Sequence, residues 1–123
     1  MSNSFNILNN AVEEILEVNK ELELTEQIKS LLNSSKIVVF MKGNADMPMC
    51  GFSANTTAIL KQLGVSFKTF NILNDEEIRQ GLKEYSNWPT YPQVYVNGKL
   101  IGGNDIVTEM YQSGELQEYL ANN

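Results

Sequence analysis

The stretch Lys36–Gly64, KIVVFMKGNADMPMCGFSANTTAILKQLG, decides the fold, because it changes from a strand pattern to a helix pattern around a single cysteine. Residues 36–41 form an apolar run rich in β-branched side chains, which is typical of a central parallel strand. After Cys50 the apolar residues recur at helical spacing, and Gly64 is placed to end the helix. The stretch therefore predicts a strand, a loop and a helix, with the thiol where the helix begins.

The rest of the chain continues this alternation of helices and strands. Thr25 predicts the start of a helix before the first strand, and residues 66–72 alternate as a second strand. Asn74 and Glu77 have the spacing of a capping box for a further helix. Asn97-Gly98 joins two short apolar runs as in a β-hairpin, and a last helix follows. This order predicts an α/β protein with a four-stranded mixed sheet and helices on both faces, which is the thioredoxin-like arrangement.

The first 24 residues have the character of an extension rather than of a domain core. Leu8, Val12, Ile15 and Leu16 fall near helical spacing, which allows a short amphipathic helix. A mobile acidic tail is the alternative for such a polar terminal piece. We therefore expect an N-terminal extension over residues 1–24 and one domain over residues 25–123.

Composition narrows the possible functions. The net charge of −6 repels phosphate backbones, which argues against nucleic-acid binding, and the longest apolar run is too short to cross a membrane. One cysteine rules out an intrachain disulfide, and the absence of histidine argues against a structural zinc site. We expect an intracellular reducing compartment, the mitochondrial matrix or the cytoplasm, between which the sequence does not distinguish.

Cys50 is the candidate catalytic or metal-binding residue. At a helix start its sulfur faces unpaired N–H groups that favour the thiolate, and Lys42 adds positive charge; a buried, inert thiol is the alternative. Ser53 stands where a two-cysteine oxidoreductase has its resolving thiol, so that mechanism is excluded. The thiolate is left with two uses, which are attack on a mixed disulfide and binding of a soft metal.

A count of ligands makes the second use concrete. A [2Fe–2S] cluster takes four thiolate-type ligands, and each chain offers one. Two chains and two molecules of glutathione, the abundant intracellular thiol, complete the set. The count is compatible with a bridged cluster, and it predicts a monomer without the cluster and a homodimer with it.

Two segments, MKGNADMPMCGFS and NWPTYPQVYVNGKLIGGNDI, together resemble the monothiol CGFS-type glutaredoxins, and the resemblance covers about Thr25 to Leu120. It implies a glutathione-ligated [2Fe–2S] cluster that is bridged between two subunits and passed to apo iron–sulfur proteins, with a role in iron homeostasis. It also implies a BolA-like partner and only weak oxidoreductase turnover. The alternative is a glutathione-dependent thiol–disulfide oxidoreductase that removes glutathione from protein thiols. The seven residues between Lys42 and Cys50 resemble the cluster-binding branch of the family.

The resemblance also assigns roles to individual residues. Cys50 corresponds to the cluster ligand, and the remaining residues to the glutathione site, in which Lys42 and Arg79 meet carboxylates and the Tyr91 backbone pairs with the cysteinyl part. Asn104 and Asp105 hold the γ-glutamyl end, and the Tyr91–Pro92 peptide is expected to be cis. The family usually has Cys or Ser where Asn104 stands, but an amide can also cap a helix and receive a hydrogen bond.

Overall fold

The computed structural model describes the backbone of residues 2–123 and the side chains of residues 9–123, and it contains a four-stranded mixed sheet in the order β2-β1-β3-β4. The central strand β1 pairs in parallel with β2 and antiparallel with β3, and β3 and β4 form the hairpin. The predicted fold class is confirmed. The strands are β1 (Ile37–Met41), β2 (Lys68–Asn71), β3 (Gln93–Val96) and β4 (Lys99–Gly102).

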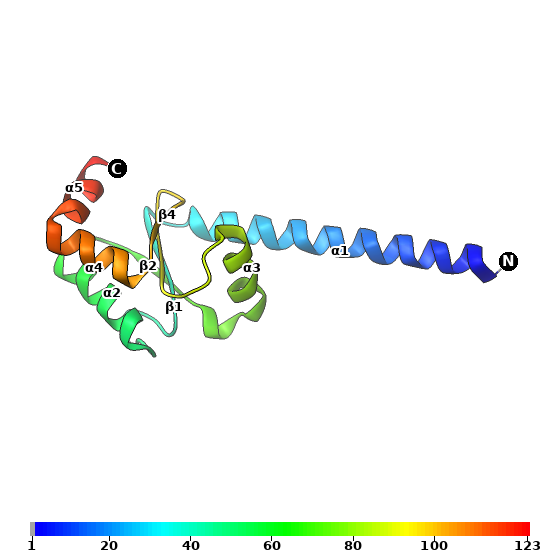
Figure 1. Cartoon of the computed structure of the whole chain (residues 1–123), viewed down its shortest axis with the longest axis horizontal. Helices are drawn as coiled ribbons and strands as arrows, with labels where there is room; N and C mark the ends of the chain where they lie inside the picture. The colour runs from blue at the N-terminus through cyan, green and yellow to red at the C-terminus, as the bar shows by residue number, and fades with distance from the viewer. Residues whose placement is uncertain (1) are drawn as a thin grey trace.

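Helices cover both faces of the sheet, as Figure 1 shows. Helices α2 (Gly51–Gln62), α4 (Asn104–Ser113) and α5 (Glu115–Asn122) lie on one face, and α3 (Glu76–Ser86) and the end of α1 (Ser2–Leu32) lie on the other. A short 3₁₀ helix, η1 (Ile72–Asn74), follows β2. The last helix, expected as one element, is divided into α4 and α5 at Gly114, whose φ of +85° ends α4 in the left-handed region. None of the helices over residues 2–123 is long and apolar enough to cross a membrane.

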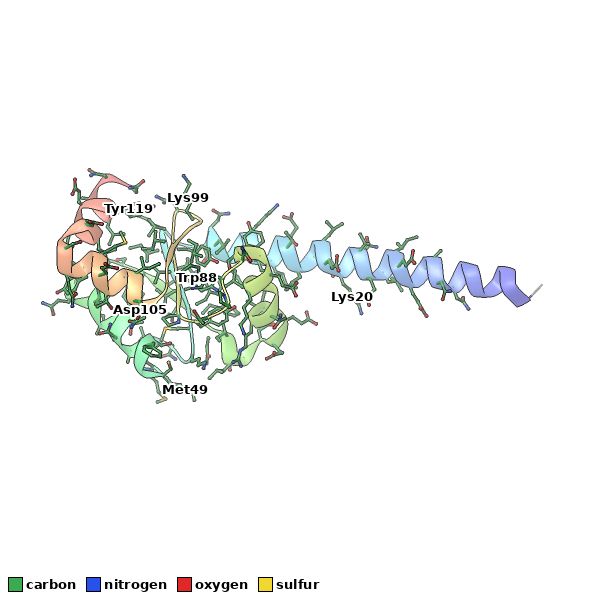
Figure 2. The ribbon with its side chains drawn as sticks, in the orientation of Figure 1. Lys20, Met49, Trp88, Lys99, Asp105 and Tyr119 are labelled. Carbon is green, nitrogen blue, oxygen red and sulfur yellow. The ribbon has the colours of Figure 1, made fainter. Side chains whose placement is uncertain are left out.

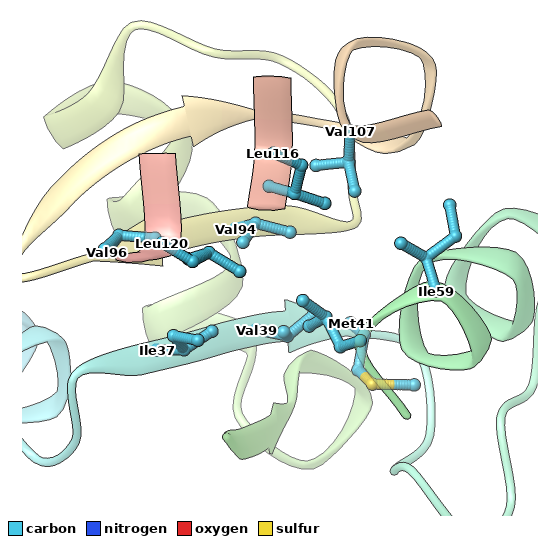
Figure 3. Close-up of a cluster of buried hydrophobic side chains, with 10 residues drawn as sticks. Ile37, Val39, Met41, Ile59, Val94, Val96, Val107, Leu116 and Leu120 are labelled. Carbon is cyan, nitrogen blue, oxygen red and sulfur yellow. The ribbon is translucent and has the colours of Figure 1, made fainter. Parts of the chain in front are cut away.

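The apolar side chains of β1 pack in two separate hydrophobic cores, one on each face of the sheet. All five of its residues are buried, and successive side chains of a strand point to opposite faces of the sheet. Ile37, Val39 and Met41 therefore pack toward α2, α4 and α5, as Figure 3 shows. Val38 and Phe40 pack on the other face, against α1 and α3. Because β1 has no solvated face, its sequence shows no alternation.

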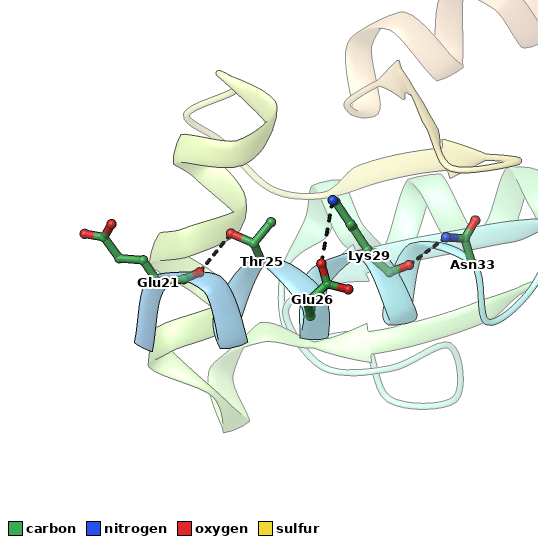
Figure 4. A network of polar contacts seen from close by, with 5 residues as sticks. All are labelled: Glu21, Thr25, Glu26, Lys29 and Asn33. Atoms are coloured by element: carbon green, nitrogen blue, oxygen red, sulfur yellow. Dashed lines mark hydrogen bonds and ion pairs between the residues drawn. The ribbon is translucent and has the colours of Figure 1, made fainter. Parts of the chain in front are cut away.

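Helix α1 corrects the prediction that a helix starts at Thr25. The helix begins at Ser2, and the Thr25 hydroxyl donates to the Glu21 carbonyl one turn earlier, at 2.9 Å (Figure 4). At the other end of this stretch the Asn33 amide donates to the Lys29 carbonyl. The preceding run is rich in Glu and Leu, which favour helix, so no cap is needed at Thr25. The chain therefore passes the expected boundary after residue 24 without a break in secondary structure.

The start of α3 lies one residue beyond the predicted capping box. Asn74 ends η1, and Asp75 is the cap, with its carboxylate accepting from the Ile78 N–H at 3.0 Å. Asn and Asp are about equally good N-cap residues. Because Asn74 and Asp75 are adjacent, the sequence alone did not determine which of them caps α3. The 3₁₀ turn after β2 decides between them.

Candidate functional site

All seven sequence-predicted site residues line one cleft of ≈ 470 Å³. They come from the loop after β1, the start of α2, helix α3, the loop before β3 and the start of α4. The fold thus brings together residues that the sequence spreads over more than half of its length. These residues are Lys42, Cys50, Arg79, Tyr91, Pro92, Asn104 and Asp105.

Cys50 is the N-cap residue of α2, and its side chain makes no capping hydrogen bond. The pKa of its thiol is lowered, first of all by the backbone N–H of Ser53, while partial burial opposes this effect. The Phe52 N–H, the Ser53 hydroxyl and the charge of Lys42 lower the pKa further, with Lys42 contributing least. The amides of the first helical turn are therefore what favours the thiolate.

Ser53 has a structural task that explains a hydroxyl at this position. Its side chain is fully buried, and the oxygen accepts from the Lys42 backbone N–H at 3.3 Å. Its carbonyl accepts from the Thr57 hydroxyl at 3.0 Å. Ser53 therefore joins the end of β1 to the first turn of α2, which fixes the cysteine relative to the sheet.

The loop of residues 42–49 is held at several points. The Met49 N–H donates to the Lys42 carbonyl at 2.9 Å, and the Gly43 N–H donates to the Asn71 side chain at 3.0 Å. Gly43 has φ +85°, and a β-carbon there would meet the Met47 carbonyl oxygen, so the turn requires glycine. The loop is thus an ordered support that places Lys42 and Cys50 on the same cleft.

The Tyr91–Pro92 peptide is cis, as the resemblance implies, and the Tyr91 side chain is anchored to α3. Its hydroxyl donates to the Arg79 carbonyl at 2.6 Å, and burial raises the pKa of this phenol. The Lys83 ammonium lies 6.0 Å from the centre of the Tyr91 ring. Tyr91 therefore fixes α3, with its two cations, against the loop that precedes β3.

A buried glutamine supports that loop from beneath. The Gln93 amide donates to the carbonyls of Trp88 and Thr90, at 3.1 and 3.2 Å, and its oxygen accepts from the Tyr95 hydroxyl at 2.8 Å. Gln93 is fully buried, so these partners take the place of the water it has lost. Gln93 belongs to the segment NWPTYPQVYVNGKLIGGNDI, and no pattern in that segment predicts this supporting role.

Trp88 and Lys83 line the cleft and were also missed by sequence reasoning. Lys83 lies four residues after Arg79 and so shares its face of α3, a spacing that could have identified it. The Trp88 indole N–H is buried and has no hydrogen-bond partner among the described residues. Gly103 permits this packing, since a β-carbon there would lie 3.1 Å from the Pro92 carbonyl oxygen and 3.5 Å from the indole nitrogen.

The start of α4 forms the opposite side of the cleft. Gly103 is the N-cap residue of α4. Asn104 therefore does not cap this helix, although an amide at that position could have done so. The Asn104 side-chain oxygen instead accepts from the Asn55 amide at 2.8 Å and the Thr56 hydroxyl at 3.0 Å, which joins α4 to α2. Asp105 lies in the first turn of α4 and is exposed (Figure 2).

Charge is divided across the cleft. Arg79 and Lys83 on α3, together with Lys42, make one side cationic, although the chain as a whole has a net charge of −6. Asp105 and the N-terminus of α4 lie on the other side of the sheet. This division suits an elongated zwitterion with a carboxylate at one end and an amino-acid group, with its ammonium and its carboxylate, at the other.

The residues described provide no complete metal site within one chain. Over that part of the chain, no three Cys, Asp, Glu or His side chains come close enough to hold a metal ion. Cys50 is the one cysteine of the sequence and is free. Cys50 therefore belongs to no such group of ligand residues over the described part of the chain.

The fold and the site define a thioredoxin-like protein with a single thiol at a helix start, beside a peptide-sized cleft. The glutaredoxin family model matches residues 37–101. The uncharacterized monothiol glutaredoxin ycf64-like of Synechocystis sp. is 58% identical over 98 residues, which is 80% of this chain and 92% of that relative. The chloroplastic monothiol glutaredoxin-S14 of Arabidopsis thaliana is 55% identical over 78% of this chain, which spans 56% of that relative's length. This chain therefore belongs to the glutaredoxin family and is similar to its monothiol members.

Solved structures agree with this assignment. The solution structure of reduced poplar apo GrxS14 has a TM-score of 0.72 and 50% identity, covering 80% of this chain and 91% of that one. The crystal structure of a buckwheat glutaredoxin–glutathione complex has a TM-score of 0.74 at 27% identity, covering 85% and 93%. The fold is therefore shared with glutaredoxins of both closer and more distant sequence.

Proposed function

We propose that this protein binds glutathione in the cleft and carries a [2Fe–2S] cluster, held by Cys50 and glutathione from each of two subunits, for transfer to apo iron–sulfur proteins. The observation that carries the proposal is the solitary thiol of lowered pKa at a cleft that is cationic on one side and carboxylate-bearing on the other. The thiol has no resolving cysteine, and the described residues hold no group of three acidic, histidine or cysteine ligands, so coordination shared with a second subunit and glutathione suits it.

The residues of the cleft fit glutathione part by part. Lys42 and Arg79 would pair with carboxylates, and the Tyr91 backbone would pair with the cysteinyl part, as in strand addition. Asp105 would hold the ammonium of the γ-glutamyl end. The glutathione complex of the buckwheat relative supports this choice of ligand.

The cluster would be cargo, and the surface around Cys50 suits its transfer. Phe52, two residues after Cys50 in α2, is 62% exposed, and Met47 and Met49 on the loop are exposed as well. Exposed apolar side chains beside a ligand residue form a rim that a second subunit, an acceptor protein or a BolA-like partner would cover. The rim also shields a bound cluster from water and oxidants.

Anaerobic reconstitution tests the proposal. Iron, sulfide and glutathione bound per chain are measured together with visible absorption, for the wild type and for Cys50→Ser. We expect equal amounts of iron, sulfide and glutathione per chain in the wild type and no bound iron in Cys50→Ser, which keeps its fold because Ser is nearly isosteric. Glutathione-free cluster binding, or a coloured Cys50→Ser protein, would contradict shared coordination.

The second candidate, removal of glutathione from protein thiols, is favoured by the same lowered pKa. The Cys50 thiolate would attack the glutathione sulfur of a mixed disulfide and release the protein thiol as thiolate. A second glutathione would then attack the Cys50–glutathione disulfide, which regenerates Cys50 and yields glutathione disulfide. Rapid turnover of a glutathionylated peptide by the iron-free protein would favour this candidate over cluster transfer.

A further inference from the structure

The N-terminal part of α1 carries an apolar face that nothing in the described structure covers. Val12, Ile15 and Leu22 are 54%, 59% and 60% exposed, and Leu16 and Val18 are exposed to a similar degree. Figure 1 shows this part of the helix extending away from the domain, and Figure 2 shows the side chains around Lys20 without a neighbouring element. A cluster of large apolar side chains on an isolated helix suggests a partner.

The domain does not use this face even where it contacts the helix. Leu24, Ile28 and Leu32 pack against α3 and the sheet. At about 100° per residue, these side chains lie on the side of the helix opposite to Val12 and Ile15. The apolar side of α1 therefore changes along the helix: residues 12–22 have a free apolar face, and residues 24–32 have a docked one on the opposite side.

The free face has the spacing of a coiled-coil seam. Val12, Ile15, Asn19 and Leu22 follow one another at intervals of three, four and three residues, as a and d positions of a heptad do. Leu16 and Val18 take the flanking e and g positions and broaden the seam. In the sequence, Leu8 continues the spacing toward the N-terminus.

The charges of α1 decide what kind of partner fits. Membrane-surface helices carry Lys and Arg on the polar face, whereas this polar face is acidic with a single lysine. Between Val12 and Leu22 these charges occupy outer positions of the heptad, so like charges on two paired helices would point away from the seam. They are Glu13, Glu14, Glu17, Lys20 and Glu21. Beyond Leu22 the seam ends, because Glu23 stands at an e position and Glu26 at the next a position.

We propose that α1 is a self-association element, which pairs in parallel with α1 of a second copy of this chain through Val12, Ile15, Asn19 and Leu22. Parallel pairing brings the Asn19 amides of the two copies together, whereas antiparallel pairing would set each against an apolar side chain and leave it without a partner. The proposal does not depend on glutathione or on a cluster.

Association through this seam is weak. The span from Val12 to Leu22 is about 15 Å long at 1.5 Å per residue, and the area it can bury is below that of standard protein interfaces. The pairing is therefore concentration-dependent. It strengthens with added salt, because salt screens the repulsion between two acidic helices.

Sedimentation velocity of the full-length, iron-free and glutathione-free protein under reducing conditions tests the proposal. We expect a monomer–dimer equilibrium that shifts to dimer with concentration and with salt, and that persists in Cys50→Ser, in which no intermolecular disulfide can form. The double variant Ile15→Gln with Leu22→Gln should lose the dimer. Its matched control, Glu14→Gln with Glu21→Gln, places the same residue type on the polar face and should keep it.

A second variant tests the register. Asn19→Leu removes the polar residue from the seam and should tighten association at least tenfold, with assemblies larger than the dimer, because a polar residue at an a position limits the oligomeric state at a cost in stability. A wild type that is monomeric at every concentration, or a double Gln variant that associates like the wild type, would overturn the proposal. So would an unchanged Asn19→Leu, or binding to phosphatidylcholine vesicles that the double Gln variant abolishes, which would assign the face to lipid.

Discussion

At the scale of single residues, the charge state of Cys50 follows from its position at the start of α2. The backbone amides of Ser53 and Phe52 belong to the first helical turn, and no substitution other than proline removes them. Lys42 acts through its charge and contributes least to the lowered pKa. The contributions of the helix start and of Lys42 to the lowered pKa of Cys50 can therefore be measured separately.

The thiolate absorbance of Cys50 in the ultraviolet, followed against pH, should have its midpoint below about 8.5, the value of a free thiol. Lys42→Gln should raise this midpoint only slightly, since the amides remain. Because the folded-state pKa is lower than that of the unfolded chain, the ionised thiol stabilises the fold above the ordinary thiol pKa, and this stabilisation is lost as the pH falls through the folded-state pKa. A midpoint in Lys42→Gln equal to that of a free thiol would assign the effect to the lysine instead.

Glutathione binding should depend on the charges on both sides of the cleft. Lys42→Ala and Arg79→Ala should each weaken binding by about 1–3 kcal/mol, because each removes a charge-assisted hydrogen bond to a carboxylate. Asp105→Ala should weaken binding from the amino end. Calorimetry checks this, with Lys99→Ala as the control, because Lys99 is exposed at the start of β4 and does not line the cleft. If all three cleft variants bind glutathione like the wild type, the tripeptide lies elsewhere.

At the scale of elements, the sequence predicted the strands, the thiol-bearing helix and the hairpin, because each depends on local patterns. The boundaries that it missed depend on contacts beyond the local pattern. Asp75 caps α3 because η1 turns the chain after β2, and α1 continues through Thr25 because the residues before it favour helix without docking. The hydrogen bonds by which Gln93 supports the loop before β3 could not be predicted, because they depend on how that loop folds over the Gln93 side chain.

The two faces of α1 should differ in their contribution to stability. Ile28 is 2% exposed within the core, so Ile28→Ala should cost about 2–5 kcal/mol through lost burial and a cavity. Ile15→Ala makes the same change at an exposed position and should stay within about 0.5 kcal/mol in dilute protein, where α1 is unpaired. Denaturant unfolding of both variants measures the difference. A large loss for Ile15→Ala at high dilution would mean that the first part of α1 docks on its own domain.

Gln93 should stabilise the loop before β3. Gln93→Leu keeps the size of the side chain but leaves the Trp88 and Thr90 carbonyls and the Tyr95 hydroxyl without this partner, which should cost about 1–3 kcal/mol. Gln62→Leu is the control, because Gln62 is exposed at the end of α2. Chemical denaturation of the two variants checks this, and equal stabilities would show that water replaces the lost hydrogen bonds.

At the scale of the whole molecule, two association surfaces lie on different parts of the chain. One is the rim around Cys50 on the domain, and the other is the free face of α1, which extends away from it. The ligand count alone predicts a monomer without the cluster, whereas pairing through α1 gives a weak dimer without it. A pair held through α1 keeps a second Cys50 at high effective concentration and so favours a shared cluster, provided that the helices allow the two sites to meet.

The two surfaces can be separated in the double variant Ile15→Gln with Leu22→Gln, in which the seam is removed and Cys50 is kept. Reconstitution with iron, sulfide and glutathione should convert this variant from monomer to dimer, because two subunits and two tripeptides are needed to complete the four ligands. Removal of the cluster by a chelator should then release monomers, since cluster binding that requires the dimer stabilises the dimer by mass action.

The same variant should load the cluster less completely than the wild type in dilute solution, because pairing through α1 no longer keeps a second Cys50 at high effective concentration. Size-exclusion chromatography with iron and sulfide analysis decides the matter. An iron-bearing monomer of the double variant would refute the shared cluster and leave the α1 seam untouched, whereas equal loading of the two proteins at every dilution would show that the seam does not assist cluster binding.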